Sequence, residues 1–205
     1  MIALTVEEAI ERAATLAAAG RSLLGIAGSP GAGKSTLSAA ITGNVPSSVV
    51  VAMDGFHMSN EDLVRLGRRD RKGAPDTFDA DAYITMLHRL RHQKSDVVTA
   101  PRYDRAASAP VPDAIAVDPD VALVITEGNY LLVDEPPWTA VRPLLDEVWF
   151  VEVDDAVRVP RLIARHIEFG KSADEAREWV MRSDEANAAM VAATRNRADI
   201  VVRLL

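Results

Sequence analysis

The chain contains no cysteine among its 205 residues, which excludes disulfide bonds, thiolate metal sites and a cysteine nucleophile. It also lacks any apolar run near the ~18 residues that a membrane-spanning helix needs, so we expect no association with a membrane. Residues 1–5 show no basic region followed by a long apolar core, so we expect no signal peptide. Together these absences predict a cytoplasmic protein.

Basic residues are outnumbered by acidic ones, and the formal net charge is −7 at pH 7. A protein that binds nucleic acid broadly needs a basic face, so we expect no nucleic-acid partner. The acidic balance does not exclude phosphate-bearing ligands, because a glycine-rich loop binds phosphate with backbone dipoles and a few local cations. A chain of this length buries about 70% of its unfolded surface, and we expect a single domain over residues 1–205.

One glycine-rich segment, residues 28–35, reads G-x-x-x-x-G-K-S. Its glycines allow a tight turn whose N–H groups point at a phosphate, and the helix that follows adds its positive N-terminal end. In this pattern Lys34 reaches the β- and γ-phosphates, and the Ser35 hydroxyl ligates Mg²⁺. A glycine-rich turn with an incidental lysine would not need the apolar run at 21–27 before it and the helical spacing at 36–41 after it. We expect a nucleoside triphosphate, taken as ATP, to be bound by Gly28, Ser29, Pro30, Gly31, Ala32, Gly33, Lys34, Ser35 and Thr36.

Apolar, strand-like runs alternate with segments of helical spacing along the chain. Several of the runs are continuous in Val, Ile and Leu, which a sheet covered on both faces requires. Together with the glycine loop they predict an α/β, three-layer P-loop NTPase fold with a mostly parallel sheet. A cluster of prolines between residues 101 and 119 predicts a long, ordered connection. We expect strands at 23–27, 49–53, 97–99, 121–126, 148–153 and 200–202, and helices at 6–19, 34–41, 81–91, 138–145, 156–169 and 173–192.

Two acidic residues directly follow two of the apolar runs, Asp54 after 49–53 and Glu127 after 121–126. Ligands of open α/β sheets sit at the carboxyl ends of the strands, where the glycine loop also lies. Either acid could merely cap a turn. Beside a phosphate loop, we expect Asp54 to be the catalytic base that accepts a hydroxyl proton. We expect Glu127 to act as a catalytic group with Lys34, and to share the Mg²⁺ shell with Ser35.

Five segments now carry a resemblance to a known family: 28–35, 53–57, 71–79, 101–105 and 127–132. In this order, and from about residue 20 to the end, the chain resembles the uridine kinase, bacterial pantothenate kinase and phosphoribulokinase superfamily of P-loop metabolite kinases. It is most similar to the branch of nucleoside kinase-like or fructose-transport-associated kinase proteins. The resemblance implies transfer of a γ-phosphoryl group, with Asp54 as the catalytic aspartate. The chain departs from uridine kinases around 102–105 and lacks much of the C-terminal substrate region of pantothenate kinase, so no acceptor is implied.

Arg158, Arg161 and Arg165 are spaced i, i+3 and i+7 and share one face of a predicted helix. A cationic stripe of this kind is usually a solvated surface, which is one interpretation. The resemblance implies another, a small helical lid at about 158–175 with a hinge at the interruption 170–172. Such a lid would bring Arg161 and Arg165 onto the transferring phosphate as catalytic groups, while Arg158 would support the helix.

Five cations crowd residues 65–72, and they could form a solvated loop or contact an anionic or hydroxyl-rich acceptor. An acceptor that is already phosphorylated would fit the second interpretation. The segment after Asp54 and the proline-rich connection offer further polar side chains for a pocket. We expect the acceptor to contact His57, Arg71, Lys72, Arg102, Tyr103 and Arg105.

We therefore predict an enzyme, a kinase that uses Mg²⁺ and ATP to phosphorylate a hydroxyl of a small metabolite such as a sugar, a nucleoside or a pantothenate-like compound. The alternative is a nucleotide-gated regulatory ATPase, in which Glu127 positions water and no small acceptor binds. A third interpretation is a catalytically weak nucleotide-binding protein. The sequence leaves open the acceptor, the preference for ATP over GTP and the oligomeric state, of which a homodimer is one option.

Overall fold

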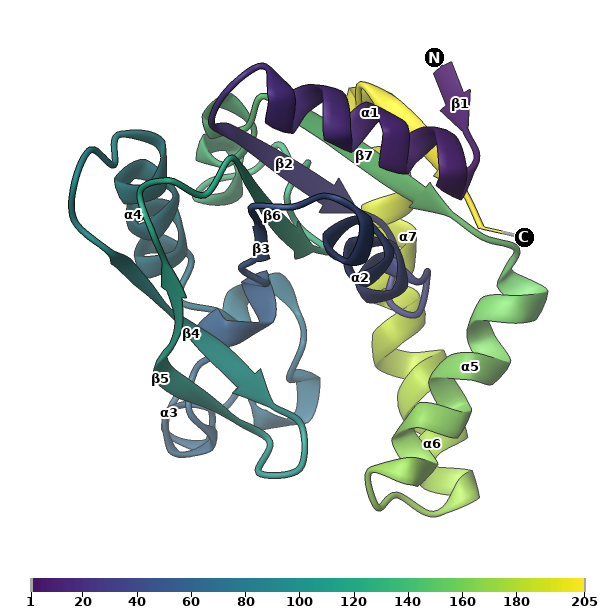
Figure 1. Ribbon diagram of the computed structural model, residues 1–205. Coiled ribbons are helices and arrows are strands. Elements are labelled where there is room, and N and C mark those ends of the chain that lie inside the picture. The colour runs from purple at the N-terminus through teal and green to yellow at the C-terminus, as the bar shows by residue number, and fades with distance from the viewer. Residues whose placement is uncertain (1, 205) are drawn as a thin grey trace.

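The computed structural model describes residues 2–204, and its centre is a sheet of six parallel strands in the order β1-β8-β7-β2-β6-β3 (Figure 1). The strands are β1 (Ile2–Leu4), β2 (Ser22–Ala27), β3 (Ser48–Val50), β6 (Leu123–Gly128), β7 (Glu147–Glu152) and β8 (Ile200–Arg203). β2 lies inside the sheet and pairs with both β6 and β7, so that Leu24 stands opposite Ile125 and Glu147. The mostly parallel α/β sheet that the sequence predicted is confirmed.

Helices cover both faces of this sheet and produce three layers. They are α1 (Val6–Ala18), α2 (Lys34–Asn44), α3 (Asn60–Arg65), α4 (Ala80–Arg91), α5 (Asp155–Glu168), α6 (Ala173–Trp179) and α7 (Glu185–Ala193). Successive residues of a strand point to opposite faces. Leu24 and Ile26 of β2 therefore pack with α1 and α2, whereas Leu23 packs with α4 and α7. No helix within the described residues 2–204 is long and apolar enough to cross a membrane.

The largest difference from the prediction lies in the proline-rich connection. The strand expected at 97–99 does not join the sheet, because β4 (Val98–Asp104) and β5 (Ala109–Val117) form a separate antiparallel hairpin. Pro110 and Pro112 lie within β5. Both strands of a two-stranded hairpin are edge strands, and edge strands tolerate a residue that has no N–H donor. The ordered connection that the prolines predicted is therefore a β-hairpin.

The helix predicted at 138–145 is wrong. In its place are two 3₁₀ turns, Trp138–Ala140 and Arg142–Leu144. Pro143 explains the break, since it supplies no N–H group and its ring clashes with a carbonyl of the preceding turn of an α-helix. Strand β1 was not predicted either, because it has only three residues and forms its pairs with β8, near the other end of the sequence.

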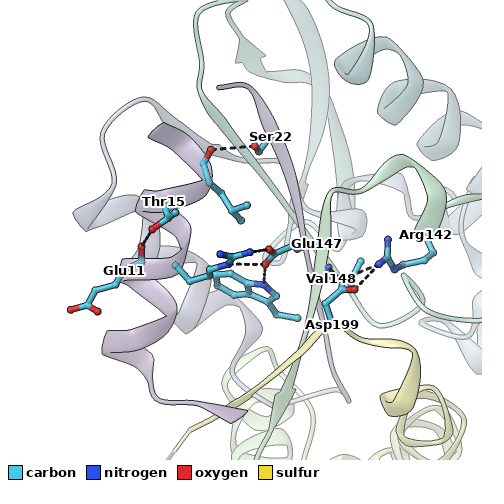
Figure 2. Close-up of polar contacts among 10 residues, drawn as sticks. Glu11, Thr15, Ser22, Arg142, Glu147, Val148 and Asp199 are labelled. Atoms are coloured by element: carbon cyan, nitrogen blue, oxygen red, sulfur yellow. Dashed lines mark hydrogen bonds and ion pairs between the residues drawn. The ribbon is translucent and has the colours of Figure 1, made fainter. Parts of the chain in front are cut away.

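Ionic contacts fasten the elements at the amino edge of the sheet (Figure 2). Glu147, the first residue of β7, accepts a hydrogen bond from the Arg12 guanidinium group of α1. Asp199, which precedes β8, accepts hydrogen bonds from Arg142 at 2.9 and 3.0 Å and from the Val148 N–H at 2.7 Å. These contacts lie at the opposite end of the strands from the glycine loop, and we therefore assign them to stability.

Two arms extend beyond the carboxyl edge of the sheet (Figure 1). The hairpin arm consists of α3, β4 and β5, and the helical arm consists of α5 and α6. A turn at Gly170, with φ of 97°, joins the two helices of the helical arm. Since the glycine loop between β2 and α2 also lies at this edge, the two arms frame the place where a ligand of an α/β sheet is expected.

Candidate active site

A cavity of about 1110 Å³ opens at the carboxyl edge of the sheet, and both arms contribute residues to it. The glycine loop forms its floor through Pro30, Gly31, Gly33, Lys34, Ser35 and Thr36. The other predicted site residues that line it are Asp54, His57, Lys72, Tyr103, Arg105, Glu127, Arg161 and Arg165. Residues that are far apart in the sequence are thus brought to one site, with the glycine loop between the two arms.

The glycine loop presents backbone N–H groups to this cavity. Gly31 and Gly33 have φ values of 78° and 93°, in the left-handed region that favours glycine. Gly33 is also the N-cap of α2, where no side chain of the described residues caps the helix, so the first N–H groups remain available to a phosphate. Gly28, Ser29 and Ala32 shape the loop without lining the cavity themselves.

Lys34 is enclosed by the loop that precedes it. Its ammonium group donates hydrogen bonds to the carbonyl oxygens of Gly28 at 2.8 Å and Ser29 at 3.1 Å, and to Asn129 Oδ1 at 2.7 Å. Burial lowers the pKa of Lys34 to about 8, although the nearby carboxylates of Glu127 and Asp54 favour its charged form. In the ligand-free protein, Lys34 therefore loses its proton at a lower pH than an ordinary lysine.

This lowered pKa predicts a pH dependence of nucleotide binding. A bound triphosphate favours the charged ammonium, so binding above about pH 8 requires uptake of a proton by Lys34. We expect the affinity for Mg·ATP to fall by up to ~10-fold per pH unit above that value. Titration calorimetry in buffers of different ionisation enthalpy measures the proton uptake. In Lys34→Arg, which stays charged throughout, this dependence is expected to vanish, and pH-independent binding by the native protein from about pH 7 to about pH 9.5 would contradict the assignment.

Asp54 and Glu127 lie near Lys34 but on different elements. Strand β3 ends at Val50, earlier than predicted, and Asp54 lies on the 3₁₀ turn that follows it. Glu127 lies within the last residues of β6 rather than after the strand. The Arg105 guanidinium group of the hairpin arm stands 3.5 Å from Asp54 Oδ2. The two carboxylates and Lys34 interact electrostatically across the cavity floor.

Ser35 at the start of α2 and Glu127 of the neighbouring strand β6 offer oxygen ligands that fit a magnesium ion. Burial raises the pKa of Glu127, while Lys34 and hydrogen bonds from Ser35 and Ser38 oppose the rise. Ser35 and Glu127 offer only oxygen ligands, which Mg²⁺ prefers. Within residues 2–204, no group of three or more His, Cys, Asp or Glu side chains could hold a metal by itself. A magnesium ion here would accordingly depend on phosphate and water oxygens for the rest of its shell, as it commonly does.

An aromatic and basic wall lies opposite the loop, on the side of the hairpin arm. The imidazole of His57 packs against the ring of Tyr103, with centroids 4.7 Å apart, and against Phe78 at 4.0 Å. Its Nδ1 atom makes a 2.8 Å hydrogen bond with the carbonyl oxygen of Asp54. Burial lowers the pKa of His57, so its neutral form dominates at pH 7. Lys72 lies over the Tyr103 ring at 5.3 Å and completes this wall.

Two of the predicted acceptor contacts lie elsewhere. Arg71 forms an ion pair with Asp76 at 2.7 Å and does not line the cavity. Arg102 is exposed on β4 and does not line the cavity either. Neighbours in a hairpin strand point to opposite sides, so the strand that carries Tyr103 into the cavity turns Arg102 away from it.

The arginines of α5 separate into two roles. Arg161 and Arg165 line the cavity, and burial lowers the pKa of Arg165. Arg158 is only 2% exposed and is bound by Asp155 and Glu185 at 2.7 Å each, and it donates to the carbonyl oxygen of Pro30 in the glycine loop. It therefore joins α5 to α7 and to the loop, which agrees with the supporting role predicted for it.

The sequence alone did not single out three polar residues of the cavity. Asn129 binds Lys34, and its position two residues after Glu127 was the available signal. His166 and Asp184 form a 2.8 Å pair between α5 and the π-helical turn Val180–Asp184. That turn interrupts the long helix predicted at 173–192, and π-turns of this kind are frequent at functional sites. A pair so far apart in sequence gives no local pattern to recognise.

Comparison with known proteins decides which kind of nucleotide-binding protein carries this site. The family described as phosphoribulokinase/uridine kinase matches residues 23–205. The chain belongs to this family. The protein is thus a P-loop kinase that acts on small molecules, as its motifs predicted. The kinase is 36% identical over 197 residues to a candidate uridine kinase of Schizosaccharomyces pombe. The matched region covers 90% of this kinase and 84% of that relative. It is 33% identical over 190 residues to the uncharacterised protein YggC of Escherichia coli, with 90% and 78% covered.

Solved structures of other proteins have the same overall fold. A candidate fructose transport system kinase from a Silicibacter species matches this kinase with a TM-score of 0.84 and 35% identity, over 97% of the kinase and 98% of that chain. YFH7 of Saccharomyces cerevisiae, described as a candidate P-loop kinase with a circular permutation, also reaches a TM-score of 0.84, over 98% and 99% of the two chains. At 17% identity, that second likeness shows the fold alone.

Proposed function

We propose that this kinase transfers the γ-phosphoryl group of Mg·ATP to a hydroxyl group of a small metabolite. The observation that carries the proposal is the position of Asp54 between two halves of one cavity. On one side lie the glycine loop and Lys34, which suit a triphosphate. On the other side lies the wall of His57 and Tyr103, which leaves room for an acceptor.

Asp54 acts as the base in this proposal. Its carboxylate accepts the proton of the acceptor hydroxyl and aligns the oxygen with the γ-phosphorus. The hydrogen bond between His57 and the Asp54 carbonyl fixes the 3₁₀ turn that carries the carboxylate. The 3.5 Å contact with Arg105 places a positive charge beside the Asp54 carboxylate. Phosphoryl transfer needs little more from the protein than such positioning and charge stabilisation.

Lys34, Arg161 and Arg165 stabilise the charge of the transferring group. Lys34 exchanges its contacts with the loop carbonyls for phosphate oxygens when a triphosphate enters. Arg161 and Arg165 approach from the helical arm, which we propose to be the lid over about residues 158–175. The turn at Gly170, predicted as the hinge, lies at the free end of the arm, so the arm moves instead about the segments that join α5 and α6 to the rest of the protein. Its closure excludes water and strengthens each of these interactions.

Ser35 and Glu127 hold the magnesium ion in this proposal. A bound Mg²⁺ supplies neutralisation of phosphate charge and orients the phosphate chain. Glu127 must be ionised for this role, and its raised pKa makes the site sensitive to acid. The hydrogen bonds of Ser35 and Ser38 to its carboxylate keep it turned towards the start of α2.

A regulatory ATPase is the competing function, and the acceptor side of the cavity argues against it. An ATPase needs room for water alone, whereas His57, Lys72, Tyr103 and Arg105 line space beyond the glycine loop. That space has the mixture of aromatic and polar groups that is typical of small-molecule sites.

The test is a panel of nucleosides, pentoses, hexoses, sugar phosphates, sugar acids and pantothenate, assayed for acceptor-dependent formation of ADP. We expect at least one class to raise the rate far above basal hydrolysis and to yield a phosphorylated product by mass spectrometry. A slow rate that no acceptor changes would overturn the kinase proposal and favour the regulatory ATPase.

A further inference from the structure

Lys72 carries a charge that the protein does not neutralise. Its ammonium group donates to Asn60 Oδ1 and the Ser108 carbonyl oxygen at 2.8 Å each, and to Ser108 Oγ at 3.3 Å. All three partners are neutral. No carboxylate of the described residues lies within 4.0 Å of it, although the protein as a whole is acidic. These contacts hold the ammonium group in place over Tyr103, and its positive charge faces the cavity without a counter-ion among the described residues.

The surrounding side chains add to this positive charge. Arg69 also lines the cavity, and no carboxylate of residues 2–204 lies within 4.0 Å of its guanidinium group. Arg105 also lines it, and its one carboxylate partner among those residues is Asp54 at 3.5 Å. The side of the cavity next to the hairpin arm therefore contains three cations, Lys72, Arg69 and Arg105, and one carboxylate, Asp54. Asp54 is needed to accept the proton of the acceptor hydroxyl, so it does not serve as their counter-ion.

The triphosphate does not account for Lys72 and Arg69, although Arg105 lies close enough to Lys34 and Arg165 to interact with them electrostatically. Lys34 of the glycine loop and Arg161 and Arg165 of the helical arm are the cations placed for phosphate charge, and Mg²⁺ neutralises more of it. Four more carboxylates line the cavity away from Lys72: Asp184 is paired with His166 on the helical arm, Glu127 lies beside Lys34 and Ser35, and Glu7 and Glu8 lie in the first turn of α1. Lys72 and Arg69 belong to the opposite side, and Lys72 contacts Tyr103 and Ser108 of the hairpin arm.

We propose that the acceptor is an anion, a hydroxy compound whose carboxylate or phosphate group binds Lys72, with Arg69 and Arg105 beside it, while its hydroxyl faces Asp54. This inference rests on the proposed kinase function and specifies its substrate class. A neutral polyol or nucleoside would leave the charge of Lys72 unpaired in a partly enclosed pocket. An anion that replaces Ser108 Oγ, the most distant of the three acceptors at 3.3 Å, forms a charge-assisted hydrogen bond and removes that cost. Acceptors without an anionic group are then discriminated against, because they offer the pocket no counter-charge.

A purely structural role for Lys72 gives a different expectation. Through Asn60 and Ser108, Lys72 ties α3 to the turn between β4 and β5. Loss of this tie would weaken every acceptor alike, whereas loss of an anion contact weakens anionic compounds selectively. Lys72→Gln removes the charge and keeps an amide that can still donate a hydrogen bond. Lys72→Met removes both. Lys94→Met is the matched control, since Lys94 is exposed and lies outside the cavity.

The experiment measures binding by calorimetry with a non-hydrolysable Mg·ATP analogue present, so that the glycine loop is occupied. The probes are two matched pairs, D-gluconate with D-glucitol and ribose 5-phosphate with ribose, together with inorganic phosphate. We expect each anion to bind at least ~10-fold more tightly than its neutral partner. Lys72→Gln and Lys72→Met are expected to weaken the anions by about 10–100-fold and the neutral compounds little, while Lys94→Met changes neither. Whichever of D-gluconate and ribose 5-phosphate binds more tightly shows whether the subsite prefers a carboxylate or a phosphate group.

Three results would overturn the inference: neutral partners that bind as tightly as the anions, equal weakening of both by the Lys72 variants, or no binding of any anionic probe including phosphate. The acceptor-dependent ADP assay separates this failure from failure of the proposed function. Phosphorylation of a neutral acceptor alone would retain the kinase and reject the anionic substrate. Lys72-dependent anion binding without any phosphorylation would retain the anion subsite and reject the kinase proposal.

Discussion

Replacing Asp54 by Asn is expected to lower kcat for acceptor-dependent ADP formation by about 10²–10⁴-fold while the affinity for Mg·ATP stays close to that of the native protein. Asparagine has nearly the same shape but cannot accept the proton of the acceptor hydroxyl, and general-base catalysis contributes an effect of this size. The loss belongs to the chemical step because Asp54 lies beyond the glycine loop that binds the triphosphate. Steady-state kinetics with an acceptor found in the panel, and calorimetry with the ATP analogue, measure the two quantities.

The control for this variant is Asp120→Asn, which removes the same charge from an exposed residue outside the cavity. We expect its kcat and its nucleotide affinity to match those of the native protein. Transfer at nearly the native rate by Asp54→Asn would show that another group accepts the proton. An equal loss of nucleotide affinity would place Asp54 in the triphosphate site instead.

Replacing Gly55 by Ala is expected to reduce both activity and stability. A Cβ atom at Gly55 would overlap the Pro101 carbonyl oxygen and lie 2.8 Å from the carbonyl carbon of β4. Because the obstacle is backbone, the 3₁₀ turn and the hairpin arm must move apart, and such overpacking costs about 1–3 kcal/mol of the free energy of unfolding. Asp54 is the adjacent residue, and a displacement of about 1 Å at a reacting group costs on the order of 10²-fold in kcat. Denaturant unfolding and steady-state kinetics measure the two losses.

Gly43→Ala provides a matched control, because the same atoms are added at another glycine. Gly43 lies near the end of α2, where an added Cβ meets no described atom within 4 Å apart from its chain neighbours and the backbone of its own helix. Alanine favours a helix over glycine by about 0.5–1 kcal/mol, so this variant is expected to be slightly more stable with native activity. If Gly55→Ala also retained native kcat and stability, the close approach of Asp54's turn to β4 would not matter to catalysis.

The sequence predicted best the parts of the fold that are buried on both faces. β2, β6 and β7 were found because a strand inside a parallel sheet must be apolar throughout, and the glycine loop between β2 and α2 has a pattern set by its own turn geometry. Asp54, on the turn after β3, and Glu127, near the end of β6, both line the cavity, since residues near the carboxyl ends of parallel strands reach the same edge as the loop.

What could not be predicted depends on pairing between distant segments. The prolines of β5 argue against a strand, and only its pairing with β4 makes the hairpin. Arg71 and Lys72 are neighbours in one basic cluster, yet Arg71 pairs with Asp76 while Lys72 reaches Ser108 of the hairpin arm. Charge content alone does not show which of two adjacent cations has a carboxylate partner.

The order of the strands also bears on how the sheet is assembled during synthesis. Ile2 of β1 pairs with Ile200 of β8, whereas β2 pairs with β6 and β7 of the intervening chain. Closing a loop of nearly 200 residues is slow because the entropy of the intervening chain must be lost before the contact forms. β1 leaves the ribosome nearly 200 residues before β8, so it has no partner until residue 200 has emerged. Until β8 has emerged, β7 is the exposed edge of the sheet, and the central strands must fold without β1 and β8.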